Sequence, residues 1–296
     1  MTTPVLCLGK LLCITLFAIP SSSAYVHTNS ALTTRTTHTK VREATGRSSS
    51  KEQTLTVCGN WTKFSSEPNS RTLKAKSIRF AAARRAAAAR QAKLRMIRME
   101  AHLLYEDLQL SSEGLDEKVL QYALIGYHRL LKRNEIQNPD ILTICDFSQP
   151  SSQKRMYVID LYAKKLVSRN YVAHGIRSGK QFASCFSNTP ESHKSSLGFY
   201  VTRNTYIGEN GLSLRLDGFD RGFNTLANRR NIVIHGAPYV SDRILEKYGV
   251  MGTSYGCPAI PEELTRDLIP VLTGGSCFFI YYPSQRYLSH SSVLNG

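Results

Sequence analysis

Two residues toward the C-terminal end, His235 and Cys257, have the types and neighbours that thiol chemistry requires. His235 ends a short β-branched run, and Cys257 lies in the glycine-rich segment GTSYGCP, residues 252–258. Gly256 and Pro258 flank the cysteine and are poor residues for packing a core, because glycine lacks a side chain and proline lacks a backbone donor. The segment therefore favours display of the thiol on a loop.

A thiolate is the reactive form of cysteine, and a neighbouring imidazole can take the thiol proton. We therefore predict Cys257 as a nucleophile and His235 as its base. Gly256 would let a substrate carbonyl approach the backbone amides around the cysteine, where an oxyanion could be stabilised. Ser254 could orient His235 or add a hydroxyl to the oxyanion site, and a plain turn role fits it equally. The residues alone also leave open a buried structural thiol or one half of a disulfide at Cys257.

The remaining histidines lack the spacing of metal ligands, so each is interpreted as a surface or hydrogen-bonded structural residue. These histidines are His128, His174, His193 and His290. We therefore expect no metal ion and no cofactor. Removal of an N-terminal signal would leave an odd number of cysteines, which indicates one unpaired thiol. These cysteines are Cys58, Cys145, Cys185, Cys257 and Cys277.

Short β-branched and aromatic runs, separated by Gly, Pro, Asn and Ser, fill the C-terminal half and predict a mainly β domain. Strands are expected over residues 141–147, 156–161, 165–173, 199–203, 213–216, 232–235 and 277–282. Helical spacing of apolar residues predicts a helix over 116–132. Short helices are also expected over 241–248 and over 261–268, where Pro261, Glu262 and Glu263 suit the first turn of a helix.

The N-terminal part divides into three segments. Residues 1–24 have a lysine, an apolar run and then small residues, which is typical of a cleaved export signal. We therefore expect an exported protein of the periplasm or cell envelope. Residues 25–72 are rich in Ser, Thr and charge and predict a disordered leader. Residues 73–109 contain no Gly or Pro and predict a basic Ala/Arg-rich helix.

The formal net charge of +16 is concentrated in the N-terminal part, where residues 25–109 hold 16 Lys or Arg and 6 Asp or Glu. Such a basic helix could be an arm that contacts an anionic wall polymer or a membrane surface. The favoured alternative is a solvated basic face on a helix that packs its apolar side against the domain, because basic faces of helices are usually just solvated.

Several separate motifs occur in one order along the chain. They are SSLGFY (195–200), SLRLDG (213–218), RGFN (221–224), VIHGAPYVS (233–241) and SYGCPA (254–259). Together they resemble the murein L,D-transpeptidase catalytic domain family. Two positions depart from the broader signature of that family, because Tyr255 stands where a histidine is usual and Ala259 where an asparagine is usual.

This resemblance implies an L,D-transpeptidase-like β-sandwich with a few short helices over residues 110–290, preceded by N-terminal helices and the leader. It implies a cysteine acyltransferase that acts on peptidoglycan peptide stems. Cys257 would attack the L-centre carbonyl of diaminopimelate in a tetrapeptide stem and release D-Ala. The resulting thioester would pass its acyl group to an amine, giving a crosslink or exchange, or to water in a carboxypeptidase reaction.

The resemblance also suggests substrate-binding residues around the dyad, namely Gly236, Tyr239, Tyr255, Arg215 and Arg221. Arg215 and Arg221 could hold stem carboxylates through forked hydrogen bonds, and a solvated or loop-bracing role remains open for both. Tyr239 could line the donor cleft.

Two functions other than that of a transpeptidase are compatible with parts of the sequence. A non-catalytic wall-binding module could keep the cleft and use the basic arm, although binding alone needs neither Cys257 nor His235. A nucleic-acid-binding protein would fit the charge, but the sequence has no recognition motif for nucleic acid and carries an export signal. No nucleic-acid partner is therefore expected.

Overall fold

The computed structural model describes residues 70–296, and the predicted export signal and most of the predicted leader lie outside this range. Two helices come first, α1 (Ser70–Asp107) and α2 (Glu117–Lys132). Helix α1 begins three residues before the predicted start of the basic helix, and its sequence has no Gly or Pro to interrupt it. The side chain of Asp116 caps α2 by accepting a hydrogen bond from the amide of Lys118 at 2.7 Å.

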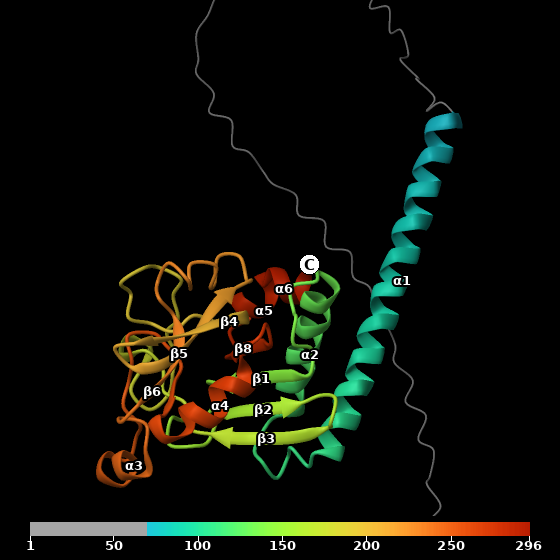
Figure 1. Ribbon diagram of the computed structural model, residues 1–296. Coiled ribbons are helices and arrows are strands. Elements are labelled where there is room, and N and C mark those ends of the chain that lie inside the picture. Colours follow the sequence, from blue (N-terminus) through green and yellow to red (C-terminus); the bar gives the residue numbers. More distant parts are fainter. Residues whose placement is uncertain (1–69) are drawn as a thin grey trace, which may run out of the picture. The chain divides into compact units, whose positions relative to one another are not determined.

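A single eight-stranded sheet forms the body of the domain, in the order β3-β2-β1-β8-β4-β5-β6-β7 (Figure 1). Its strands are β1 (Ile141–Asp146), β2 (Met156–Asp160), β3 (Lys165–Asn170), β4 (Gly198–Gly208), β5 (Gly211–Gly218), β6 (Val233–Ala237), β7 (Ala259–Pro261) and β8 (Cys277–Tyr281). Strand β8 joins two antiparallel groups, because it pairs parallel with β1 and antiparallel with β4. The apolar face of α2 packs next to β1, and the stacked rings of Phe199 and Phe279 lie in the same core.

The sheet is nearly closed on itself. Beyond β3, Ala173 forms an isolated bridge with Ala259 of β7, so the two edge regions of the sheet meet. Since Ala259 also pairs with His235 of β6, this closure lies directly beside the predicted base. The fold thus brings residues 173–175, 233–237 and 254–259 together.

Short helices complete the domain. They are η1 (Ile176–Ser178), α3 (Asp242–Tyr248), η2 (Glu262–Leu264), α4 (Thr265–Leu272), α5 (Gln285–His290) and α6 (Ser292–Asn295). Within residues 70–296, none of the helices is both long enough and apolar enough to span a bilayer.

The mainly β fold with short helices and preceding N-terminal helices is confirmed, and several boundaries differ from expectation. The predicted strand 165–173 ends at Asn170, because the chain then leaves β2 and bridges to β7 instead. The predicted helix 261–268 starts at Glu262, because Pro261 has an extended backbone and pairs with Ala237. Strand β7 and helices α5 and α6 were not predicted.

Candidate active site

Strand β6 carries His235 and fixes the orientation of its imidazole. The side chain is buried, and its Nδ1 lies 2.8 Å from the carbonyl oxygen of Gly236. A carbonyl can only accept, so Nδ1 carries the proton in a neutral ring and Nε2 is left as the acceptor. Burial lowers the pKa of His235 from its ordinary value of 6.5, and the bond to Gly236 opposes that shift. The imidazole is therefore neutral near pH 7 and suited to accept a proton.

Gly236 is a close-packing position. A Cβ at this residue would lie 2.5 Å from the methyl group of Thr265 and 3.0 Å from the Cα of Glu262. The start of helix α4 and the turn before it therefore press directly against β6. This contact, together with the bond to Nδ1, makes Gly236 a support for His235.

Cys257 lies at the beginning of the same strand pair. Its free, half-buried thiol contacts the carbonyl oxygen of Asn231 at 3.5 Å, and it also interacts with the backbone of Val233. Asn231 and Val233 immediately precede His235 along the chain, and β7, which follows Cys257, pairs in register with β6. Among residues 70–296 no hydrogen bond joins the thiol to the imidazole. The structure thus brings the two residues to one strand end, with the thiol donating to backbone.

The pKa of the Cys257 thiol is shifted in opposite directions by its surroundings. Burial raises the pKa of Cys257, and the Val233 backbone hydrogen bond and the positive charge of Arg230 lower it. Because burial is the largest effect, the resting thiol keeps its proton near pH 7. A neutral thiol beside a neutral imidazole needs a proton transfer before it can attack a carbonyl.

Arg230 is a cation that acts on Cys257 and lies outside the motifs that carry the family resemblance. One terminal nitrogen, Nη1, donates to the carbonyl of Ser187 at 2.7 Å and to the hydroxyl of Ser196. The other, Nη2, donates to the carbonyl of Lys194 at 2.6 Å and to the hydroxyl of Ser192 at 3.2 Å. The guanidinium therefore ties the 187–196 segment to the base of β6 while its charge acts on the sulfur.

The loop that carries Cys257 is closed by Ser254. Its hydroxyl donates to the carbonyl of Cys257 at 2.7 Å and accepts from the amide of Gly256 at 3.0 Å. These bonds make Ser254 the closing residue of a turn, one of the readings that the sequence left open. Gly256 has φ of 127°. A Cβ there would lie 2.9 Å from the carbonyl of Lys194, so both conformation and space favour glycine.

Residues 172–179 also hold the loop that carries Cys257, through backbone hydrogen bonds to Ser254. His174 accepts the amide of Ser254 on its carbonyl at 3.0 Å, and Ile176 donates its amide to the carbonyl of Ser254 at 2.7 Å. The side chain of His174 is fully buried, with Nδ1 2.7 Å from a nitrogen of Arg155 and Nε2 3.0 Å from the carbonyl of Gly179. Burial and the Arg155 charge lower the pKa of His174 to about 4, so this imidazole is neutral.

The predicted substrate-binding residues occupy different places. Tyr239 is half-buried and packs against a small apolar cluster that includes Ala237 and Met251, and burial raises its pKa to about 12. Tyr255 is 74% exposed and packs against His193 with ring centroids 4.6 Å apart. Tyr239 therefore packs beside the end of strand β6, and Tyr255 lies at the outer surface of its loop.

The two predicted arginines are also separated. Arg215 pairs in register with Val233, and its exposed guanidinium stacks over Tyr206 at 4.4 Å. Directly paired residues share a face of a sheet, so Arg215 lies on the His235 face of strands β5 and β6. Arg221 is exposed, and its amide donates to Ser292 at 3.0 Å. It is therefore part of the turn that packs on α6.

The other cysteines in the described part of the chain are also free thiols. Cys145 and Cys277 are fully buried in neighbouring strands, as expected of a small apolar residue at Cys277, and Cys185 is exposed. No group of His, Cys, Asp and Glu in residues 70–296 has the arrangement of a metal site. Cys257 is thus the cysteine of this range that lies beside a histidine-bearing strand end.

Three supporting residues, Arg155, His174 and Arg230, were missed as part of the site. His174 was interpreted only as a surface or hydrogen-bonded structural histidine, and the second interpretation is confirmed. Arg230 precedes the motif that contains His235, but adjacent arginines give no sign of which one turns inward. Arg155 lies about a hundred residues before the nucleophile, and only the closure of the sheet brings its partner to the loop.

Comparisons with known proteins agree with the motifs. A family model described as the L,D-transpeptidase catalytic domain matches residues 111–281, more than half of the chain. The chain is similar to an L,D-transpeptidase from Mycobacterium smegmatis at 11% identity and TM-score 0.30, covering 48% of this chain and 59% of that chain. It is also similar to the helical cell shape determining protein Pgp2 from Campylobacter jejuni at 15% identity and TM-score 0.31, covering 54% and 57% of the two chains.

The chain spans less than two thirds of the length of these solved structures. No curated protein matches it. The family match contains both His235 and Cys257 and all strands of the sheet, and it confirms the resemblance read from the motifs. The chain belongs to the L,D-transpeptidase catalytic domain family.

Proposed function

We propose that this protein is a peptidoglycan L,D-transpeptidase in which Cys257 is the nucleophile and His235 its general base. The donor would be a tetrapeptide stem, cleaved at the L-centre carbonyl of diaminopimelate. The observation that carries this proposal is the orientation of His235, whose Nδ1 is tied to Gly236 at 2.8 Å on the strand whose start holds the Cys257 sulfur.

In the acylation step, the thiol proton of Cys257 passes to Nε2 of His235 and the sulfur forms a bond to the stem carbonyl carbon. The carbonyl π electrons move to oxygen, which becomes an oxyanion. The amide of Cys257 has no acceptor among residues 70–296, so it is available to donate to this oxygen. Collapse breaks the bond to D-Ala, which leaves as an amine after taking the proton from His235.

In the second step an amine of another stem attacks the thioester carbonyl. His235 takes a proton from the amine, the new amide forms, and the Cys257 sulfur leaves and is protonated again. Water in place of the amine would give a carboxypeptidase reaction, and a free D-amino acid would give exchange. Each step uses the same side chains and needs no redox reagent.

Product analysis tests the proposal directly. Purified protein is incubated with a disaccharide-tetrapeptide, and mass spectrometry follows loss of D-Ala and formation of dimers. The wild type should release D-Ala, and Cys257→Ala should not, while Cys185→Ala, which removes an exposed free thiol, should behave as wild type. Undiminished release by Cys257→Ala would reject Cys257 as the nucleophile.

The N-terminal segments would bring the enzyme to its substrate. We propose that residues 1–24 direct export to the periplasm or cell envelope, where peptide stems are present. Cell fractionation and N-terminal sequencing test this, and the expected mature end is Tyr25. A full-length protein that stays in the cytoplasm would contradict it.

A basic helical arm is the feature that favours the second candidate, a non-catalytic wall-binding protein. Residues 70–99 of α1 hold ten Lys or Arg and no Asp or Glu, and the side chains described within 71–93 are exposed. Its positive charges suit an anionic wall or membrane surface.

Sedimentation with cell-wall sacculi separates the two candidates. If the arm binds walls, a variant with Arg79, Arg84 and Arg85 changed to Gln should lose sedimentation and keep D-Ala release. If binding is the whole function, the wild type should sediment but release no D-Ala, and Cys257→Ala should sediment equally well.

A further inference from the structure

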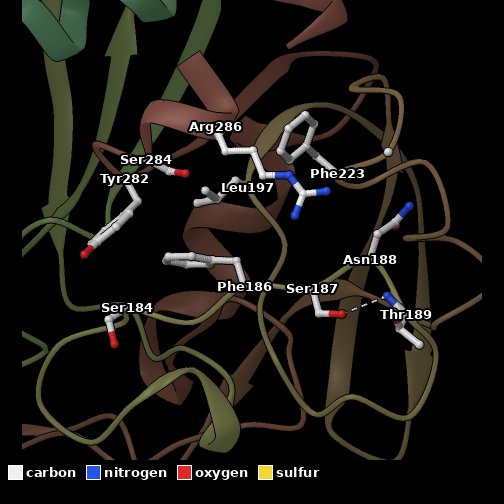
Figure 2. A pocket seen from close by; sticks show the side chains of 11 residues that line it. Ser184, Phe186, Ser187, Asn188, Thr189, Leu197, Phe223, Tyr282, Ser284 and Arg286 are labelled. Carbon is white, nitrogen blue, oxygen red and sulfur yellow. Dashed lines mark hydrogen bonds between the residues drawn. The ribbon is translucent and has the colours of Figure 1, made fainter. Parts of the chain in front are cut away.

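A pocket of about 330 Å³ opens at the surface beside α5, and it contains neither His235 nor Cys257 (Figure 2). Three aromatic side chains, Phe186, Phe223 and Tyr282, line it together with the buried Leu197. Its volume is at the small end of the range for sites that hold small molecules or peptide ends. The pocket is therefore large enough for a short segment of a ligand.

Among residues 70–296, Arg286 is the only charged residue that lines this pocket. Figure 2 shows its guanidinium extending over the opening, next to Phe223, and the two groups lie 6.0 Å apart. Among residues 70–296 the guanidinium makes no hydrogen bond and no ion pair. With no carboxylate in the lining, the pocket offers a positive charge and selects for an anion.

Helix α5, which carries Arg286, is held firmly against the domain. The hydroxyl of Tyr287 donates to the buried carboxylate of Asp220 at 2.9 Å. Ser284 caps the helix by accepting the amide of Tyr287 at 3.3 Å, and Val293 beyond the helix donates its amide to Asp220 at 3.1 Å. These hydrogen bonds fix the position of the helix that carries Arg286.

Most other polar groups of the pocket are already used. Asn188 accepts the amide of Leu226 at 3.0 Å and donates to Thr225 at 3.3 Å, and Ser187 accepts the amide of Thr189 at 3.0 Å. The hydroxyl of Tyr282 has no hydrogen-bond partner among the described residues. The Arg286 guanidinium is therefore the charged group left for a ligand, and the rings of Phe186 and Phe223 lie in the same pocket, which fits a carboxylate attached to an aliphatic segment.

The pocket is coupled to the nucleophile through one arginine. Ser187 lines the pocket, and its carbonyl accepts a hydrogen bond from Arg230 at 2.7 Å. Arg230 also exerts its charge on the thiol of Cys257. A ligand in the pocket would therefore lie against the segment that borders the nucleophile, without occupying the nucleophile itself.

We propose that this pocket binds the free carboxylate end of the peptide stem that serves as acyl acceptor, with Arg286 as the recognition residue. This proposal rests on the proposed function. The carboxylate would pair with the guanidinium, and the aliphatic part would contact Phe186 and Phe223. The pocket holds the acceptor by its end while its amine is directed to the thioester at Cys257.

Calorimetric titration of the full Cys257→Ala chain tests the site without turnover. The probe is a tripeptide stem with a free terminal carboxylate, which cannot be a donor because it lacks D-Ala, compared with its terminal amide. The free acid should bind at least about tenfold more tightly than the amide, the minimum expected for a charge-assisted pair. Arg286→Gln should remove this preference, and Arg243→Gln, which changes an exposed arginine on α3, should leave it intact.

Equal binding of the free acid and the amide would overturn the proposal that this pocket binds a carboxylate. An unchanged preference for the acid in Arg286→Gln would overturn the role of Arg286. A separate D-Ala release assay, with active enzyme and a tetrapeptide donor, distinguishes this failure from failure of the proposed function. If the enzyme releases D-Ala but the titration shows no preference, only the pocket proposal fails. If the titration shows the preference and no D-Ala is released, the pocket stands as a carboxylate site and the transpeptidase proposal fails.

Discussion

The guanidinium of Arg155 donates to the imidazole of His174 at 2.7 Å, although both side chains are fully buried. Arg155 also donates to the carbonyls of Val172 and Gln149 and lies 4.6 Å from the ring of Phe147. Two basic groups can be adjacent here because His174 is neutral and accepts on Nδ1. The pair fixes the 172–179 segment, which in turn holds the loop of the nucleophile.

Because His174 is neutral in the folded protein, we expect the folded protein to lose stability in acid. The pKa of His174 is lowered from 6.5 to about 4 in the folded protein, so the unfolded chain binds a proton first as pH falls. The stabilisation is complete above pH 6.5 and is lost as pH falls toward 4. At roughly 1.4 kcal/mol per unit, the loss in unfolding free energy is about 3 kcal/mol.

Urea unfolding across this pH range measures the effect. His174→Gln removes the titrating group and keeps an amide that can accept from Arg155 and donate to Gly179. Its unfolding free energy should fall less between neutral and acid pH than that of the wild type. Parallel pH dependences in the two proteins would contradict the assignment to His174.

The pH dependence of catalysis should follow His235. Burial lowers the pKa of this imidazole below 6.5, and the protonated ring cannot accept the thiol proton. We therefore expect kcat/KM for D-Ala release to fall on an acid limb whose apparent pKa lies below 6.5. His235→Asn should lower kcat by about a hundred- to ten-thousand-fold. An acid limb centred above 6.5 would show that the base is not this buried, neutral histidine.

The positive charge of Arg230 should affect the pKa of Cys257. Its charge lowers the pKa of Cys257, so Arg230→Gln should move the pH midpoint of Cys257 alkylation upward. Arg230→Lys keeps a charge but cannot make all four hydrogen bonds to the 187–196 segment, so it should restore part of the shift and less of the thermal stability. Arg229→Gln, an exposed neighbour, serves as the control. Equal midpoints in Arg230→Gln and Arg229→Gln would disprove the electrostatic role.

Gly256 should tolerate no side chain. Its φ of 127° and the nearby Lys194 carbonyl disfavour a Cβ, so Gly256→Ala should displace the nucleophile and lower kcat by more than about tenfold. Gly211→Ala is the control for left-handed conformation alone, because Gly211 has φ of 72° and open space around it. Similar activity in the two variants would mean that loop crowding does not position Cys257.

Local patterns predicted most of the sheet, because strands β1, β2, β4, β5, β6 and β8 are β-branched or aromatic runs with glycine or polar residues between them. Strand β7 is a run of three residues, too short for a periodic signal, and it exists because its backbone pairs with β6. Helices α5 and α6 are similarly short and depend on the buried carboxylate of Asp220, a long-range partner that no local pattern shows.

The candidate site also combines residues that local sequence could suggest with residues that only the folded sheet brings together. Cys257, Ser254 and Gly256 lie in one short loop, and His235 ends a clear strand, so sequence spacing could suggest the dyad. Arg155 and His174 act through the bridge between Ala173 and Ala259, which forms only when the sheet curves round on itself. The pocket around Arg286 combines segments near residues 186, 223 and 282, and its open guanidinium is visible only in three dimensions.

Trapping the acyl-enzyme tests the central claim most directly. After rapid acid quenching with tetrapeptide donor, intact mass analysis and peptide mapping should find the stem, minus D-Ala, attached to Cys257 as a thioester. The adduct should be absent from Cys257→Ala and present at the wild-type level in Cys185→Ala. An adduct on any other residue, or release of D-Ala with no dependence on Cys257, would contradict the account.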